Sequence, residues 1–290
     1  MKNINGIHDF PQWLRFRAPS KGNGREVELL ISTLKIDTVC KSALCPNRPV
    51  CWSRKIATFL LLGDTCTRNC KFCAVKKGIP LTPDPLEKEK ILHALEILRL
   101  KYVVLTMVTR DDLPDGGAFH ISEIVKHIRN KIPEIKIEVL VSDFGGNEES
   151  LKTILDSGPD VFSHNIETVE RLCGVVRDRR CSYTTSLKVL ETVNKLSPDT
   201  IIKSGLMLGL GEMEIEVLKT LRDLKNSGCK IVTIGQYLQP TKNNYPVKEF
   251  IQPDKFRFYS DWAKEKLGLA VIAGPEVRSS YKADFWYSES

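Results

Sequence analysis

The chain has 290 residues, and its 43 basic and 36 acidic residues give a formal net charge of +7. That length is enough to bury a hydrophobic core without covalent staples. The basic residues form no long run and accompany no recognition motif, which argues against a nucleic-acid partner. No apolar run reaches about eighteen residues, so we expect no membrane span. The first residues form neither a secretory signal nor a transit peptide, and we therefore expect a cytoplasmic protein.

The N-terminal part of the chain is rich in residues that interrupt regular structure. Residues 1–35 contain several prolines and glycines, which predicts an extended arm. A cysteine triplet follows, in which Cys40, Cys45 and Cys51 form a C-x4-C-x5-C pattern. We assign residues 1–55 to an N-terminal segment that holds this triplet.

From residue 56 onward, short apolar runs alternate with stretches whose apolar residues recur every three or four positions. The runs are rich in β-branched residues and are mostly bounded by Gly, Pro or Asp, as expected for buried parallel strands. They cover 56–62, 102–105, 137–141, 160–163, 201–207 and 231–234. The six strand–helix units in 56–268 are too few for a complete eight-unit barrel. The sequence therefore predicts an α/β fold, a partial (β/α)6 TIM-type barrel, with residues 269–290 as a short C-terminal tail.

A second cysteine triplet follows the first predicted strand directly, with Cys66, Cys70 and Cys73 in a C-x3-C-x2-C pattern. Functional residues of such barrels lie at the carboxyl ends of the strands, so this triplet is expected at the barrel mouth. Polar segments follow other strands and are expected at the same mouth. They are 109–117, 163–168, 208–212 and 235–240.

Two cysteine triplets with this spacing indicate iron–sulfur sites, because cysteine thiolates hold such clusters. Three ligands leave the fourth iron of a cubane for another ligand or for a bound substrate. Disulfides fit poorly in a chain without a secretory signal. Structural zinc usually takes four ligands in two pairs, which neither triplet provides. The other cysteines, Cys173, Cys181 and Cys229, are scattered and are predicted to be ordinary buried or partly buried thiols.

The second triplet resembles the signature of the radical S-adenosylmethionine superfamily, and further segments resemble the lipoyl synthase family within it. The first of these segments is the first triplet, together with the residues that follow two of its cysteines, 45–47 and 51–52. The others are 111–118, 164–168, 205–212, 235–240 and 278–281. The resemblance covers nearly the whole chain, from Trp13-Leu14 to Tyr281. Two departures from the family pattern, Lys41-Ser42 and Lys55-Ile56, lie beside the first triplet and remove no ligand.

The resemblance implies a role for each group of residues. Cys66, Cys70 and Cys73 hold a 4Fe–4S cluster that binds S-adenosylmethionine through its fourth iron. The first triplet holds a second, auxiliary 4Fe–4S cluster, whose fourth ligand is Ser280. Arg278 is the alternative functional residue of that C-terminal motif.

The residues expected to contact S-adenosylmethionine come from two of the polar segments and from the residues that directly follow the second of these. They are Asp112, Asn165, Glu167 and Arg171. For the acidic loop the alternative is a structural one, a Gly-Gly turn that caps the next helix with Asp115 nearby. For the other three residues the alternative is an ion pair that fixes the helix after the fourth strand. Lys203 and Gln236 lie at strand ends and are equally compatible with a purely structural role.

The activity that the resemblance implies is the insertion of sulfur at C6 and C8 of a protein-bound octanoyl-lysine, with two S-adenosylmethionine molecules consumed. The expected partners are an octanoylated lipoyl carrier domain, from a 2-oxoacid dehydrogenase E2 or a glycine cleavage H protein, a reducing flavodoxin or ferredoxin, and an iron–sulfur cluster carrier. The alternatives are a methylthiotransferase, which would need a further C-terminal module, and a non-enzymatic cluster carrier or electron-transfer protein.

Overall fold

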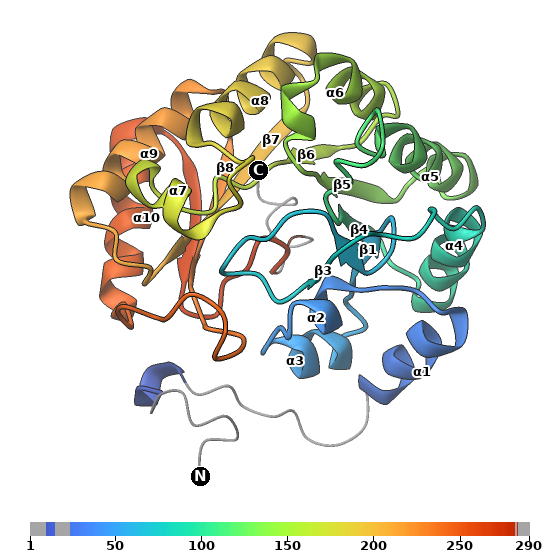
Figure 1. The fold of residues 1–290 in the computed structure, drawn as a ribbon, viewed down its shortest axis with the longest axis horizontal. Coiled ribbons are helices and arrows are strands. Elements are labelled where there is room, and N and C mark those ends of the chain that lie inside the picture. The colour runs from blue at the N-terminus through green and yellow to red at the C-terminus, as the bar shows by residue number, and fades with distance from the viewer. Residues whose placement is uncertain (1–9, 15–23, 282, 284–290) are drawn as a thin grey trace.

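The protein folds around a single curved parallel sheet with helices on its outer side, as a computed structural model shows (Figure 1). The structure describes residues 10–14, 24–281 and 283. The sheet has the order β1-β4-β5-β6-β7-β8-β9, and every neighbouring pair is parallel. Its strands are β1 Thr58–Leu61, β4 Tyr102–Met107, β5 Lys136–Leu140, β6 Val161–Ser163, β7 Ile201–Leu208, β8 Ile231–Gln236 and β9 Ala270–Gly274.

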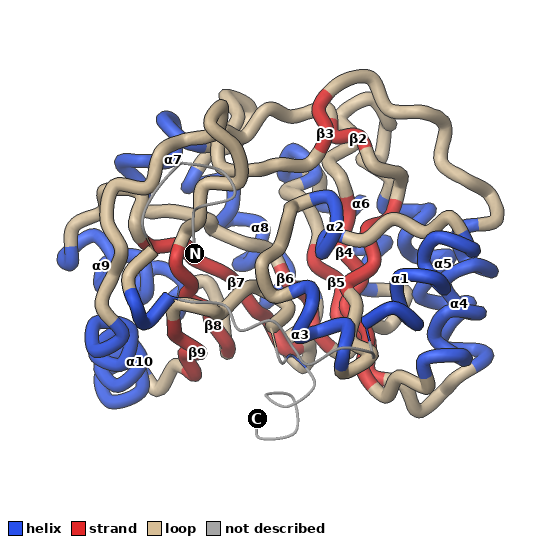
Figure 2. The backbone as a smooth tube through the Cα atoms, turned by 90° about the horizontal axis from the view of Figure 1, so that it is seen from below, coloured by secondary structure: helices blue, strands red, loops and turns tan. Residues whose placement is uncertain are grey.

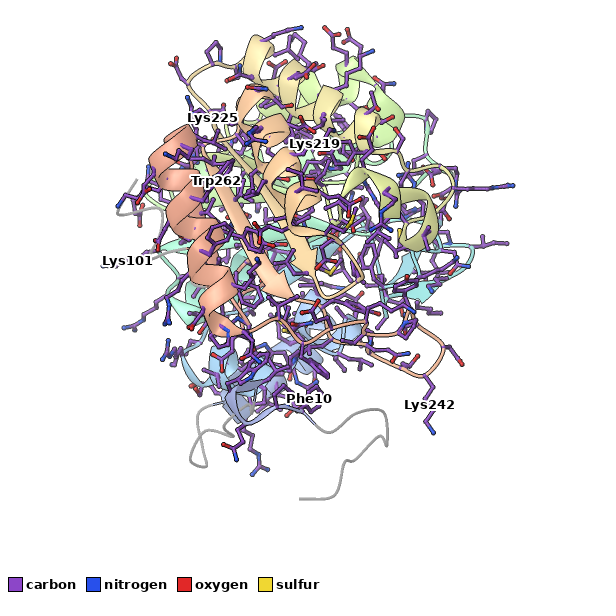
Figure 3. The ribbon with its side chains drawn as sticks, turned by 90° about the vertical axis from the view of Figure 1, so that its left-hand side faces the viewer. Phe10, Lys101, Lys219, Lys225, Lys242 and Trp262 are labelled. Atoms are coloured by element: carbon purple, nitrogen blue, oxygen red, sulfur yellow. The ribbon has the colours of Figure 1, made fainter. Side chains whose placement is uncertain are left out.

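The outer layer consists of the helices that connect successive strands, and each buries one apolar stripe against the sheet. They are α4 Glu87–Leu98, α5 Ala118–Lys131, α6 Glu148–Leu155, α8 Tyr183–Leu196, α9 Glu214–Asn226 and α10 Pro253–Leu267. The short helix α7 Glu170–Val176 lies instead on the side of the sheet where β2 and β3 lie (Figure 2), and short 3-10 turns occur at η1 Gln12–Leu14 and η2 Phe144–Gly146. In α5 the buried stripe contains Ile121, Ile124, Val125 and Ile128, as its spacing predicts. On the side of α9 and α10, the guanidinium of Arg222 lies 5.0 Å from the ring centre of Trp262 (Figure 3).

Each of the six predicted apolar runs overlaps a strand, which confirms the partial-barrel prediction. The sheet nevertheless has a seventh strand, in residues that were predicted to belong to the tail. β9 pairs with β8 from Ala270 to Gly274, so the barrel extends beyond residue 268. The run is short, and no helical pattern follows it to mark a further strand–helix unit.

The N-terminal segment is also more regular than predicted, within the part that the structure describes. Gly24–Leu34 forms helix α1, with Val27 and Ile31 buried one turn apart, where an extended arm was expected. The rest of the predicted arm, 1–9 and 15–23, lies outside the described residues. Helices α2 (Val39–Ser42) and α3 (Arg48–Ser53) follow beside β1, which is one edge of the open sheet (Figure 1).

A second, two-stranded sheet was not predicted either. It pairs β2 (Thr65–Cys66) with β3 (Lys76–Lys77) around the second cysteine triplet. Figure 2 shows this pair above the large sheet, and β2 follows β1 in the chain. Within the described part of the chain, no helix is long and apolar enough to cross a membrane.

The barrel interior contains a buried ion pair. Lys203 of β7 donates to both carboxylate oxygens of Glu138 of β5 at 2.9 Å, and both side chains are almost fully buried. Tyr102 and Ser163 donate to the same carboxylate at 2.7 and 2.8 Å. Lys203 therefore has the structural role that was one of its two predicted alternatives.

Breaking this ion pair should destabilise the barrel strongly. Replacing Lys203 with Met leaves the Glu138 carboxylate buried without a cation, and we expect the free energy of unfolding to fall by about 3–5 kcal/mol. Urea denaturation of the cluster-free protein measures this. The double variant Glu138→Leu/Lys203→Met should recover most of the loss. The exposed pair Lys152–Asp156 provides the control, and Lys152→Met should change little. If Lys203→Met and Lys152→Met lowered the free energy of unfolding equally, the structural role of the buried ion pair would be contradicted.

Candidate functional site

Both cysteine triplets line one cavity of about 690 Å³ at the mouth of the barrel. Its walls come from the loops after the strands, from the segment that holds α2 and α3, and from the tail after β9. The predicted site residues that line it are Cys40, Cys45, Cys51, Cys66, Cys70, Cys73, Asn165, Glu167 and Ser280. A volume of this size is typical of a small-molecule or cofactor site.

The loop of the second triplet is fixed through its backbone carbonyls by one distant segment, residues 244–245. Asn244 donates to the carbonyls of Lys71 and Cys73 at 3.1 and 3.0 Å, and the Tyr245 amide donates to the Lys71 carbonyl at 2.8 Å. Burial raises the pKa of the Cys73 thiol to about 11. Iron binding would replace that proton, because thiolates are the ligands of such clusters.

The first triplet lies on two short helices and the turn between them. Cys40 is in α2, Cys51 is in α3, and Cys45 lies between them after Leu44, which has a positive φ of 51°. Burial raises the pKa of Cys40. In the same turn, Asn47 is buried and donates to the carbonyl of Glu276 in the tail at 2.7 Å.

The tail brings Ser280 to the first triplet. The Ser280 hydroxyl accepts a hydrogen bond from the Thr58 hydroxyl at 2.8 Å, and the backbone of Thr58 hydrogen-bonds the thiol of Cys40. The tail approaches the sheet so closely that a Cβ at Gly235 would lie 2.0 Å from the Val277 carbonyl oxygen. Arg278, the alternative functional residue, also lines the cavity, but it donates to the Val277 carbonyl within the tail at 2.6 Å.

Asn165 and Glu167 present polar groups to the same cavity. The side-chain amide of Asn165 donates to Glu167 at 3.1 Å and to the hydroxyl of Ser279 at 2.8 Å. Burial raises the pKa of Glu167, whose backbone has a positive φ of 68°. The pair can accept and donate hydrogen bonds to a ligand beside the second triplet.

The structure does not bring Asp112 and Arg171 to this site. Within the described residues neither lines the cavity: Asp112 pairs with Arg110 at 2.7 Å, and Arg171 pairs with Glu216 at 2.7 Å. For Arg171 this is the ion-pair alternative. Asp115 accepts from the amides of Gly117 and Phe119 at 2.9 and 2.8 Å and so caps α5, which is the structural alternative for the acidic loop. Contact of Asp112 or Arg171 with a cofactor stays a prediction.

A charged network beside Cys70 was not predicted from the sequence. Arg68, inside the second triplet, donates to Asp111 at 2.8 Å and to the buried Asp143 at 2.7 Å. Its other contact is the sulfur of Cys181 at 3.2 Å, so this cysteine belongs to the site although it was predicted to be an ordinary thiol. The one sequence feature that pointed to Arg68 was its position between Cys66 and Cys70.

The arrangement fits a cluster better than a single metal ion. Among the described residues, no three His, Cys, Asp or Glu side chains converge closely enough to hold one ion. A 4Fe–4S cluster requires instead thiolates distributed around a cavity. Each triplet supplies three thiols to the cavity wall, and all nine cysteines are free of disulfides.

Comparison with known proteins places this geometry in a family. Residues 60–249 match the family model of the Radical SAM superfamily. The lipoyl synthase of Chlamydia caviae is 50% identical over 277 residues, covering 94% of this chain and 88% of the relative. That of Caldicellulosiruptor bescii is 48% identical over 274 residues and covers 94% of each chain. The mitochondrial lipoyl synthase of Clavispora lusitaniae is 48% identical over 278 residues, covering 94% and 71%.

Solved structures agree on the fold. The FeFe-hydrogenase maturase HydG from Carboxydothermus hydrogenoformans has a TM-score of 0.60 at 14% identity, covering 87% of this chain and 66% of that one. Methylornithine synthase has a TM-score of 0.53 at 14% identity, covering 80% and 64%. The shared fold shows only the architecture, whereas the identity and coverage of the sequence relatives show the family. The chain belongs to the lipoyl synthase family of the Radical SAM superfamily.

Proposed function

We propose that the second cysteine triplet binds the 4Fe–4S cluster that cleaves S-adenosylmethionine, and that the first triplet with Ser280 binds the 4Fe–4S cluster that gives up sulfur. The observation that carries the proposal is the single cavity lined by both triplets and by Ser280. As a lipoyl synthase, the protein inserts two sulfur atoms at C6 and C8 of a protein-bound octanoyl group. When bound, the clusters supply the electron for cofactor cleavage and the sulfur for insertion.

The substrate explains why one cavity must serve both steps. The C–H bonds at C6 and C8 of an octanoyl chain are unactivated, so no side-chain base can remove their protons near neutral pH. A hydrogen atom has to be taken instead, by the adenosyl radical. The protein's contribution is to hold the reacting groups in line and to exclude other hydrogen donors. Apolar side chains in the cavity wall suit the acyl chain, and they include Val39, Leu44, Ile56, Leu60 and Met107.

Asn165 and Glu167 are proposed to contact S-adenosylmethionine. Their hydrogen-bonded side chains line the cavity that contains the second triplet. The side-chain amide of Asn165 also donates to Ser279, the neighbour of Ser280. One short polar chain therefore connects the proposed cofactor site with the proposed fourth ligand of the auxiliary cluster.

The chain acts on an octanoylated lipoyl carrier, as its family does. We propose three further points that the family membership leaves open. The carrier is a 2-oxoacid dehydrogenase E2 domain or a glycine cleavage H protein, a flavodoxin or ferredoxin supplies the electrons, and a cluster carrier rebuilds the auxiliary site. We propose a cytoplasmic location for these steps, because exposed cluster thiolates need a reducing compartment.

The activity can be tested directly with anaerobically reconstituted protein and dithionite. We expect 5′-deoxyadenosine from S-adenosylmethionine and conversion of an octanoyl-lysine peptide to its lipoyl form, both followed by mass spectrometry. Formation of 5′-deoxyadenosine without the lipoyl product would reject the proposed substrate chemistry. Formation of neither would instead favour a cluster carrier.

The assignment of Ser280 predicts a selective defect. Ser280→Ala should preserve S-adenosylmethionine cleavage but reduce lipoyl formation at least tenfold, because the proposed auxiliary cluster loses its oxygen ligand. Ser280→Cys should restore cluster binding, since thiolates are the preferred ligands. The two products are measured in the same reaction. Full lipoyl formation by Ser280→Ala would reject the ligand assignment.

The two triplets should bind their clusters independently. Replacing Cys40, Cys45 and Cys51 together with Ala should halve the iron and sulfide content of the reconstituted protein. S-adenosylmethionine cleavage should continue, because the second triplet is intact, whereas no lipoyl product should form. The matched variant lacking Cys66, Cys70 and Cys73 should retain the same iron content but lose both products. Complete loss of iron in the first variant would show that the triplets do not form separate sites.

A further inference from the structure

The tail contains two adjacent serines whose hydroxyls bond to different partners. Ser280, the proposed fourth ligand of the auxiliary cluster, is bonded to Thr58 at 2.8 Å. The hydroxyl oxygen of Ser279 accepts a hydrogen bond from Nδ2 of Asn165 at 2.8 Å, across 114 positions of the chain. Both Ser279 and Asn165 line the cavity. Ser279 has no role in the cluster assignment, so this contact needs an explanation of its own.

The backbone of the tail is anchored just before Ser279. The carbonyl of Glu276 accepts a hydrogen bond from the buried side chain of Asn47 at 2.7 Å. The next residue, Val277, lies directly against β8, because a Cβ at Gly235 would come within 2.0 Å of the Val277 carbonyl oxygen. The tail is thus tied both to the segment of the first triplet and to the sheet, and the Ser279 hydroxyl has a fixed place beside the cavity.

The contact between Asn165 and Ser279 depends on a glycine in β7. A Cβ at Gly205 would lie 2.6 Å from Oδ1 of Asn165 and 3.0 Å from the hydroxyl oxygen of Ser279. Both distances are shorter than an ordinary van der Waals contact, so a side chain at this position would displace the Asn165 amide from the serine. Gly205 therefore leaves the space in which the two side chains meet.

The hydrogen bonds of Asn165 decide which end of its amide can serve a ligand. Nδ2 carries two N–H groups, and it donates to Ser279 at 2.8 Å and to Oε1 of Glu167 at 3.1 Å. Both donors are therefore used within the protein. Oδ1 has no hydrogen-bond partner among the described residues and is not one of their buried unpaired atoms. The amide thus offers its oxygen, as an acceptor, to the cavity.

We propose that Ser279 is a positioning residue that orients the Asn165 amide, so that the amide oxygen accepts a hydrogen bond from S-adenosylmethionine. The inference rests on the proposed function, in which Asn165 contacts this cofactor. S-adenosylmethionine offers donors in its ribose hydroxyls and its amino group. An amide that is already oriented binds more tightly, because its rotation need not be frozen on binding. Since Ser279 adjoins Ser280, one tail segment both orders the cofactor site and supplies the oxygen ligand of the auxiliary cluster.

The test is the affinity of the anaerobic holoprotein for S-adenosylmethionine. Isothermal titration calorimetry without a reductant measures binding while the cofactor stays uncleaved. We expect Ser279→Ala to raise Kd about three- to tenfold, because one hydrogen bond that orients the amide is lost. Ser260→Ala is the matched control and should leave Kd unchanged. Its hydroxyl donates to the Val271 carbonyl at 2.7 Å, and Ser260 is not among the described residues that line the cavity.

Two further variants test whether Ser279 acts through Asn165. Gly205→Ala places a methyl group against both side chains and should raise Kd at least as much as Ser279→Ala does. Asn165→Ala removes the proposed cofactor contact itself, so that adding Ser279→Ala to it should cause no further loss of affinity. The iron and sulfide content and the circular dichroism of each variant check that both clusters and the fold are retained.

Three results would overturn the inference. The first is an unchanged Kd in Ser279→Ala. The second is an additive loss of affinity in the double variant, because Ser279 would then act independently of Asn165. The third is the loss of half of the iron from Ser279→Ala, which would assign the serine to the auxiliary cluster instead. An unmodified holoprotein that does not bind S-adenosylmethionine at all would reject the proposed cofactor site, on which the inference rests.

Discussion

The parallel pairing of seven strands is the constraint on which the site depends. Because every strand of the sheet runs in the same direction, the segments that follow β1, β6 and β8 all emerge at one edge. That edge collects the second cysteine triplet, Asn165 with Glu167, and the loop after Gln236 around one cavity. The buried pair between Lys203 and Glu138 lies within the same sheet and links β7 to β5. A strand out of register would displace site residues together with the core.

The open side of the barrel provides the second half of the site. The sheet ends at β1 and β9 and does not close, so α2, α3 and the tail can reach the cavity from this side. Thr58 at the start of β1 contacts both Cys40 and Ser280, and Gly235 has no side chain that would keep the tail away. In a reaction that transfers a hydrogen atom and then sulfur, both events have to occur within the reach of one acyl chain. A partial barrel with an inserted tail satisfies this requirement, whereas a closed barrel would fill its interior with packed side chains.

Much of this arrangement could be predicted from the sequence. Buried parallel strands give short β-branched runs, and closely spaced thiols give a pattern that few other sites share, so the fold class and both triplets were accessible. The missing elements have physical reasons. β9 has no helix pattern after it, and the apolar spacing of α1 was obscured by the glycines and prolines around it. Side-chain partners are set by three-dimensional proximity. Neither the pairing of Arg171 with Glu216 nor the contact of Arg68 with Cys181 can be read from the spacing of residues along the chain.

The bond from Asn47 to Glu276 joins residues that are 229 positions apart in the chain. During synthesis on the ribosome, the first triplet leaves the exit tunnel long before the tail that covers it has been translated. The nascent chain therefore exposes these thiols without their polar cover for most of its elongation. The second triplet differs, since its loop is anchored by Asn244, which emerges earlier than the tail. The order of synthesis thus supplies the anchor of the second triplet, Asn244, before the contact of the first triplet with Glu276.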